Sequence, residues 1–233
     1  MMLQFLVMEK KLLNRLVFDI DDSLYLESDY VLSGFRSVGE WMLTYYGVEG
    51  FFEKARNYFL EGNRGDIFNR VLADININDN DLVPKLVDIY RAHEPVIHLL
   101  PDVQLFFESC CANKLAIITD GYSVSQWTKI RSLKLEKWIE KIIVTDDWGR
   151  EYWKPHPRAF ETVQSSFSPE CCVYIADNPL KDFIAPTKLG WMPSIRIRRI
   201  GSIHYNVPTP DNCIEVTSFA EITSVLSRKQ KCL

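Results

Sequence analysis

Five short apolar runs, separated by helical patterns, constrain the fold of this chain more than any other feature. The runs lie at residues 15–20, 114–119, 141–145, 171–176 and 194–197. Their interiors are continuous Val, Ile, Leu and Phe rather than alternating, which is typical of strands covered on both faces. Helical patterns lie between them, at residues 103–112, 124–133, 157–166 and 180–189. This alternation predicts an α/β fold with a doubly wound, mainly parallel sheet.

One connection departs from this alternation. About ninety residues separate the first run from the second, whereas a crossover between parallel strands needs only about a dozen. Most of this interval has helical periodicity, at residues 31–46, 51–59, 67–72 and 82–90. We therefore predict an inserted α-helical cap domain at residues 25–94, and a core domain formed by residues 1–24 and 95–233. Pro95 and Pro101 break the helical pattern near the end of the cap.

The last part of the chain returns to the core. Residues 201–212 are rich in Pro, Asn and Thr and predict a surface loop, and residues 213–216 predict a last strand. Thr217 or Ser218 is then expected to cap a helix that runs to Leu226. We interpret the three arginines that lie around the fifth run as a solvated edge, with substrate binding as the alternative. They are Arg196, Arg198 and Arg199.

Composition argues against several classes of partner. A net charge of −4 and a pI near 5.6 give no electrostatic basis for binding nucleic acid or an acidic membrane. No apolar run approaches the roughly 18–20 residues of a membrane span, and the apolar residues 1–8 lack the features of a signal peptide. We expect a cytoplasmic protein, a monomer or a homodimer, with reduced thiols and no disulfide framework. The cysteines are Cys110, Cys111, Cys171, Cys172, Cys213 and Cys232.

Acidic residues follow the apolar runs. Carboxylates at the end of a buried strand are costly unless they serve a purpose, and ligands of open α/β sheets bind outside the carboxyl ends of the strands. We therefore predict a single site at this edge of the sheet. Its candidate residues are Asp19 and Asp21 after the first run, Thr119 after the second, Lys154 after the third and Asp177 after the fourth.

In this order the residues resemble the four motifs of the haloacid dehalogenase superfamily. The first motif, D-x-D-x-[ST]-L, corresponds to residues 19–24, and Thr119 and Lys154 provide the second and third. The fourth corresponds to residues 176–182. Ser23 replaces the commoner Thr, and Ala176 replaces the Gly before the acidic residue. The resemblance implies a Rossmann-like core with a cap similar to those of phosphoglycolate-phosphatase-like and nucleotidase-like members.

The resemblance also implies a Mg²⁺-dependent phosphatase that acts on a small phosphorylated metabolite. Asp19 would attack phosphorus and form an aspartyl-phosphate, and Asp21 would be the general acid and base. Each carboxylate repels the phosphate by roughly 4 kcal/mol per charge pair at ~4 Å, so cations are needed to offset this repulsion. The implied Mg²⁺ ligands are the side chains of Asp19 and Asp177 and the backbone carbonyl of Asp21. Lys154 would supply a second positive charge.

The remaining motif residues are expected to support this chemistry. Thr119, Lys154 and the backbone N–H groups of Asp120 and Gly121 would bind the phosphate. The Asp120 side chain is expected to shape its own turn. Asp182 would orient Lys154 from outside the metal site, and Asn178 would form a hydrogen bond near the metal.

Other polar and aromatic residues receive structural interpretations. Asp22 is expected to be a solvated or capping residue of its loop, with a second catalytic acid as the alternative. Asp146 and Asp147 are expected to have a loop or helix-capping role, with contact to the metal as the alternative. His156 fits the start of a helix, and His93 and His98 do not form a metal site with it. The cap aromatics are expected to be mainly core. They are Phe51, Phe52, Tyr58 and Phe59.

Three other functions compete with a phosphatase. A phosphotransferase or mutase of the same fold would keep Asp21. A 2-haloacid dehalogenase is disfavoured because halide leaves without a proton, so that enzyme does not need the acid at Asp21. A non-catalytic binding protein is disfavoured because every motif residue is present. The sequence of the cap does not indicate which phosphate monoester would be the substrate.

Overall fold

The computed structural model describes residues 14–79, 81–109, 114–165 and 167–229 of the 233-residue chain. The apolar N-terminal residues 1–8, three of the cysteines and the end of the predicted helix at 103–112 lie outside the described residues. The three cysteines are Cys110, Cys111 and Cys232. No described helix is both long enough and apolar enough to cross a membrane.

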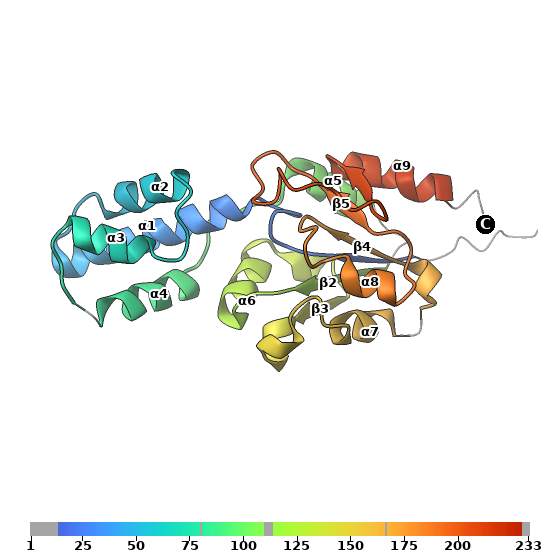
Figure 1. The fold of residues 1–233 in the computed structure, drawn as a ribbon, viewed down its shortest axis with the longest axis horizontal. Helices are drawn as coiled ribbons and strands as arrows, with labels where there is room; N and C mark the ends of the chain where they lie inside the picture. Colours follow the sequence, from blue (N-terminus) through green and yellow to red (C-terminus); the bar gives the residue numbers. More distant parts are fainter. Residues whose placement is uncertain (1–13, 80, 110–113, 166, 230–233) are drawn as a thin grey trace, which may run out of the picture.

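A six-stranded parallel sheet forms the centre of the larger lobe (Figure 1), with the strand order β3-β2-β1-β4-β5-β6. This strand order and the parallel pairing confirm the prediction of a doubly wound α/β fold. The predicted strands are all present, with ends that differ by no more than two residues. They are β1 (Arg15–Phe18), β2 (Lys114–Thr119), β3 (Lys141–Val144), β4 (Cys172–Ala176), β5 (Ile195–Ile197) and β6 (Ile214–Val216).

Both faces of the sheet are covered, as the continuous apolar runs predict. Leu16 and Phe18 of β1 point into one cluster with α5 (Pro101–Ser109), α6 (Ser123–Ser132) and α9 (Phe219–Lys229). Val17 points into the other cluster, with α7 (Arg158–Gln164) and residues around α8 (Ile184–Lys188). The α8 helix is shorter than the predicted 180–189 because residues 178–182 form a turn held by polar side chains.

A second lobe is formed by the helices α1 (Glu27–Tyr46), α2 (Phe51–Leu60), α3 (Ile67–Asp74) and α4 (Leu82–Ala92) (Figure 1). We call it the cap lobe, and we call the larger lobe with the sheet the core lobe. The cap lobe has an apolar core of its own. Phe35 lies at its centre, with its ring centroid 6.1 Å from that of Phe59 and 5.8 Å from that of Phe68. Gly47 ends α1 in the left-handed conformation that glycine adopts without strain, and its N–H donates to the carbonyl of Leu43.

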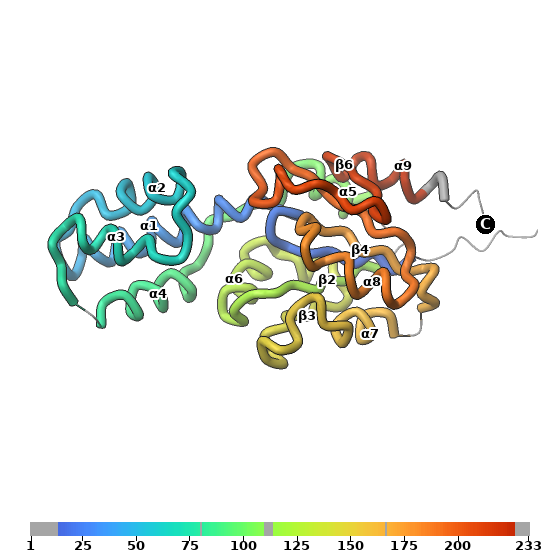
Figure 2. Tube along the Cα trace, viewed as in Figure 1, coloured from blue at the N-terminus to red at the C-terminus, as the bar shows by residue number. Residues whose placement is uncertain are grey.

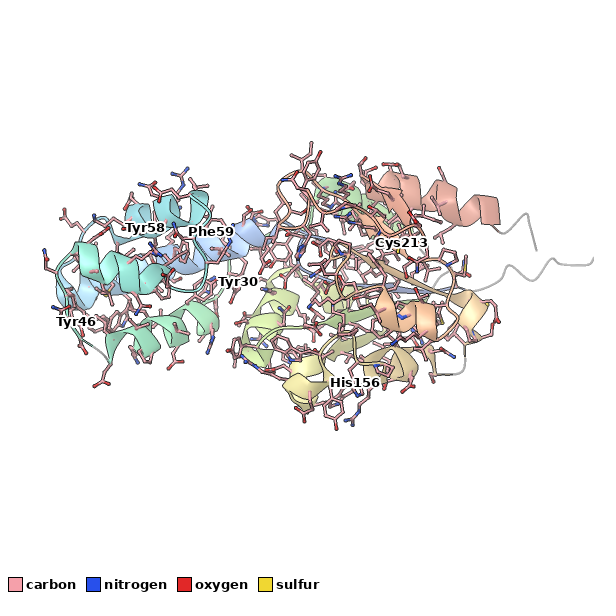
Figure 3. The ribbon with its side chains drawn as sticks, in the orientation of Figure 1. Tyr30, Tyr46, Tyr58, Phe59, His156 and Cys213 are labelled. Carbon is pink, nitrogen blue, oxygen red and sulfur yellow. The ribbon has the colours of Figure 1, made fainter. Side chains whose placement is uncertain are left out.

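Two chain segments join the lobes, and the tube in Figure 2 shows them running side by side. The N–H of Leu100 donates to the carbonyl of Leu24 at 3.0 Å. The Ser125 hydroxyl of α6 donates to the carbonyl of Arg91 at the end of α4, at 3.2 Å. In Figure 3 Tyr30 lies near this junction, whereas Tyr46 lies at the far end of the cap lobe. The junction therefore brings α1 and α4 next to the carboxyl edge of the sheet.

The prediction of a solvated arginine edge is wrong for two of the three arginines. Arg196 is 1% exposed, and its guanidinium donates to the carbonyls of Asp177, His204 and Val207. Arg199 is also buried, and it donates to the carbonyl of Ser23 and to Asp102. A planar guanidinium can satisfy several carbonyls at once, so burial is tolerated here. Only Arg198 is partly exposed, beside Glu215.

Candidate active site

The loops after β1, β2 and β4 and the segment that carries Lys154 meet at the carboxyl edge of the sheet. Asp120 joins three of them. One of its carboxylate oxygens accepts the N–H of Lys154 at 3.0 Å and the hydroxyl of Thr145 at 2.7 Å. The other oxygen lies 2.5 Å from the ammonium of Lys181. Asp120 therefore links neighbouring loops instead of shaping its own turn, which was the expectation from the sequence.

A buried lysine lies at the centre of the site. The Lys154 ammonium is 3.0 Å from Asp19 Oδ1, 2.9 Å from Asp182 Oδ1 and 3.0 Å from the hydroxyl of Tyr174. Burial raises the pKa of Asp19 to about 7, although Lys154 opposes this shift. Burial alone would lower the pKa of Lys154, but Asp182 and Asp19 raise it well above its usual value. Lys154 is therefore a fixed positive charge beside the candidate nucleophile.

Three carboxylates at this edge face one another. One oxygen each of Asp19, Asp177 and Asp182 lie within 4.8 Å of each other, the only such metal-sized group among the described residues. Asp177 Oδ2 is buried and has no hydrogen-bond partner among the described residues. Burial raises the pKa of Asp177 to about 9, with Asp182 and Asp19 adding to the effect. Converging hard oxygen donors with one unsatisfied atom fit a divalent cation such as Mg²⁺.

Asp21 lies in a separate cluster of donors. Lys129 Nζ is 2.7 Å from its Oδ1 and 2.9 Å from its Oδ2, and the Gln126 amide donates to Oδ2 at 3.0 Å. The Tyr25 hydroxyl donates to Oδ1. Burial alone would raise the pKa of Asp21, but Lys129 and these hydrogen bonds hold it below its usual value. Sequence reasoning missed both residues of α6, because polar residues three apart on a helix resemble a solvated face.

Of the residues around the second motif, Gly121 lines the site but the Thr119 side chain does not. Thr119 is fully buried, and its hydroxyl donates to Gln126 Oε1 at 3.1 Å instead of facing a cavity. Gly121 does line the site, with a φ of +123°. A Cβ at this position would lie 2.6 Å from Gln126 Nε2, so glycine allows the close packing of α6.

Two cavities open around these groups. A smaller one of about 170 Å³ contains Asp19, Lys154 and Asp177 in its wall. A larger one of about 420 Å³ lies between the lobes. The two share Asp21, Glu27, Asp120 and Gly121 in their walls. Glu27, Lys181 and His204 line the smaller cavity although the motifs did not indicate them. His204 comes from the loop 201–212, which therefore forms part of the site.

The remaining predicted residues have structural contacts. Asp22 is buried, so the solvated interpretation is wrong, but it accepts the N–H of Glu27 at the start of α1. The Asn178 side chain accepts the N–H of Leu180 at 2.9 Å, within its own turn. Asp146 accepts the N–H of Ser123 at the start of α6, as a capping residue does. His156 Nδ1 accepts the N–H of Arg158 at the start of α7.

This geometry can be compared with known proteins. A family model described as "Haloacid dehalogenase-like hydrolase" matches residues 16–193. The chain belongs to this family. The resemblance seen in the four motifs is thereby confirmed, and so is the prediction of a hydrolase.

Curated relatives of this hydrolase share a single name. This chain is 28% identical over 203 residues to the glyceraldehyde 3-phosphate phosphatase of Methanocaldococcus jannaschii. The match covers 78% of this chain and 83% of the relative. The chain is 26% identical over 206 residues to the protein of the same name from Methanopyrus kandleri, covering 81% and 85%. These relatives extend over most of both chains, cap and core included.

Solved structures agree on the fold of this hydrolase. YfnB from Bacillus subtilis, determined with magnesium bound, has a TM-score of 0.63 at 18% identity, over 93% of this chain and 99% of that one. The 2-haloacid dehalogenase of Pseudomonas syringae pv. Tomato has a TM-score of 0.61 at 20% identity, with the same coverage. At these identities the similarity extends to the fold alone.

Proposed function

We propose that this hydrolase is a Mg²⁺-dependent phosphatase that cleaves a small organic phosphate monoester through an aspartyl-phosphate on Asp19. The observation that supports this most strongly is the position of Asp19, 3.0 Å from a buried lysine and grouped with Asp177 and Asp182. A carboxylate nucleophile can approach a phosphate dianion only where positive charge surrounds both groups. The curated relatives, which are named phosphatases, give independent support.

Binding of the phosphoryl group is assigned to the smaller cavity. The Lys154 ammonium and the backbone N–H groups of Asp120 and Gly121 would hold its oxygens. The Thr119 hydroxyl, expected to take part, donates to Gln126 in this structure. It would have to exchange this partner for a phosphoryl oxygen. Asp182 would keep Lys154 directed at the nucleophile, from 2.9 Å away.

The ion would be held by Asp19, Asp177 and the backbone carbonyl of Asp21, where it would neutralise charge on the phosphoryl oxygens. Asp19 would attack phosphorus, and Asp21 would give a proton to the departing alkoxide. In the second half, Asp21 would accept a proton from the water that hydrolyses the aspartyl-phosphate. Acid–base assistance of this kind is typically worth ~10²–10⁴ in rate. The same Asp21 argues against a dehalogenase, because halide leaves without a proton.

Helices α1–α4 are proposed to act as a cap domain, residues 25–94, over a core of residues 1–24 and 95–233. The larger cavity would then hold the leaving group, with residues of both lobes in its wall. Glyceraldehyde 3-phosphate, the substrate in the names of the relatives, is the first compound to test. The panel should also include sugar phosphates, nucleotides and phosphoglycolate.

Replacement of the nucleophile tests the mechanism. Asp19→Asn keeps the size of the side chain and removes its nucleophilic charge. We expect phosphate release from 4-nitrophenyl phosphate to fall by on the order of 10⁴-fold or more. Full activity of this variant would exclude the covalent mechanism. Lys188→Met, at an exposed lysine of α8, serves as a control for altered surface charge and should keep normal activity.

Removal of divalent ions tests the cofactor. We expect EDTA to stop phosphate release and added Mg²⁺ to restore it, because Asp177 Oδ2 has no other partner among the described residues. Turnover that continues in EDTA would contradict the proposed metal dependence.

A further inference from the structure

Lys129 is a buried cation that the four motifs do not include. It is 3% exposed and lies on α6, one helical turn after Gln126. Its ammonium lies 2.7 and 2.9 Å from the two oxygens of Asp21. An ammonium in this position is costly to bury unless it is paired. Its only ion pair among the described residues is with Asp21.

The other contacts of Asp21 all come from donors. Gln126 Nε2 donates to one oxygen, and the orientation of its amide is set by the Thr119 hydroxyl, which donates to its Oε1. The Tyr25 hydroxyl donates to the other oxygen from a fully buried ring. Both oxygens of Asp21 therefore act as acceptors, which matches a carboxylate. A carboxylate is the form of Asp21 that can take a proton from water.

The position of Lys129 is fixed from two more directions. Asp146, after β3, accepts the first N–H of α6 and so anchors the helix that carries Lys129. On the cap side, the ring of Tyr30 in α1 lies 4.3 Å from the Lys129 ammonium. Lys129 thus lies between the carboxylate of Asp21 in the core and an aromatic ring of the cap lobe.

We propose that Lys129 is a positioning residue for the second half of the reaction, in which it holds the Asp21 carboxylate ready to accept the proton of the attacking water. This inference rests on the proposed function. In that step a water oxygen bonds to phosphorus and the bond between phosphorus and the Asp19 oxygen breaks. One proton of the water passes to Asp21, and inorganic phosphate leaves. Asp21 then carries the proton that the next leaving group needs.

An aryl phosphate separates the two halves of the reaction. 4-Nitrophenolate leaves without help from an acid, so formation of the aspartyl-phosphate should not depend on Lys129. In Lys129→Met we expect a burst of one nitrophenolate per protein molecule, followed by turnover about 10–100-fold slower than normal. We expect kcat to fall while kcat/KM stays within about threefold, because only the step after the first release is slowed.

The burst also counts folded sites, which distinguishes slow hydrolysis from a damaged fold. A parallel fall of kcat and kcat/KM without a burst, or an unchanged kcat, would overturn the role of Lys129. Tyr25→Phe removes one hydroxyl from the same carboxylate and provides a second test if Lys129→Met does not fold. It should also lower kcat more than kcat/KM, by about tenfold.

Asp21→Asn distinguishes this inference from the proposed function. If Asp21→Asn turns over normally, the assignment of Asp21 as general base is wrong and the proposed function fails with it. If Asp21→Asn is slow with a burst while Lys129→Met keeps normal kcat, only the role of Lys129 is excluded. Lys188→Met is again the matched control and should show normal kcat and kcat/KM.

Discussion

The two lobes are stabilised by different kinds of contact. Between Ser23 and His93, the described residues include no buried charged side chain, and the cap core is formed by aromatic and aliphatic groups. The carboxyl edge of the sheet instead buries charged side chains that form ion pairs, Lys154 with Asp19 and Asp182, and Lys129 with Asp21. Apolar packing is non-directional, whereas buried charges need specific partners. We therefore expect the chemistry to take place in the core lobe and the cap lobe to contribute mainly apolar wall residues.

Loss of the central cation should have the largest effect on the core lobe. In Lys154→Met, Asp19 and Asp182 lose the charge that lies within about 3 Å of both. We expect kcat for 4-nitrophenyl phosphate to fall by on the order of 10⁴-fold, equal to about 5 kcal/mol. Circular dichroism should confirm a folded protein. Activity within tenfold of normal would show that Lys154 is not needed for the chemistry.

A cavity in the cap lobe should affect stability instead. Phe35 is 4% exposed and packs against Phe59 and Phe68. Phe35→Ala should lower the free energy of unfolding by about 4 kcal/mol, measured by urea denaturation. Leu60→Ala is the control, because Leu60 lies on α2 and is 62% exposed. Equal losses in the two variants would contradict an apolar core around Phe35.

Loss of the buried Arg196 guanidinium should give an intermediate effect on the core lobe. Arg196→Met removes donors from the carbonyls of Asp177, His204 and Val207. We expect a loss of about 3 kcal/mol in unfolding free energy and lower phosphatase activity, because the loop that carries His204 is released. Arg198→Met removes only a partly exposed pair with Glu215 and should be milder. Similar losses for both variants would argue against a stabilising role of the Arg196 hydrogen bonds.

A surface pair of the cap should have the smallest effect. Arg70 and Asp66 form an exposed ion pair one turn apart at the start of α3. Solvent screens such pairs, so Arg70→Ala should leave the melting temperature and kcat unchanged within measurement error. A clear loss of activity would show that the cap surface takes part in turnover.

The sequence predicts the strands and most of the site because both depend on local patterns. Continuous apolar runs mark buried strands, and the residues directly after them must lie at one edge of a parallel sheet. Asp19, Lys154, Asp177 and Asp182 meet there for that reason. The cap helices were also predictable, because residues 31–46 have strong helical periodicity. Helix α1 begins only one turn before this predicted range.

The missed residues depend on packing between distant segments. Lys129 and Gln126 contact Asp21 because α6 packs beside the loop after β1, and their helical pattern does not reveal this packing. Arg196 is buried because the loop after β5 folds back over it. Its guanidinium donates to the hydroxyl of Thr209, which is thirteen residues further along the chain. Short-range patterns cannot indicate which polar side chain will find a partner across the fold.

The hydrogen bond between Leu100 and Leu24 places the entry and the exit of the cap next to each other. The intervening chain is therefore a loop whose two ends are in contact. Each doubling of its length would raise the entropic cost of closing this loop by only about 0.6 kcal/mol. Strand β1 pairs in parallel with β2, with Arg15 opposite Lys114, on the core side of this connection. We therefore expect that residues 27–92 can be exchanged for another insert as a unit, which would change the substrate preference while the candidate site at the carboxyl edge keeps its structure.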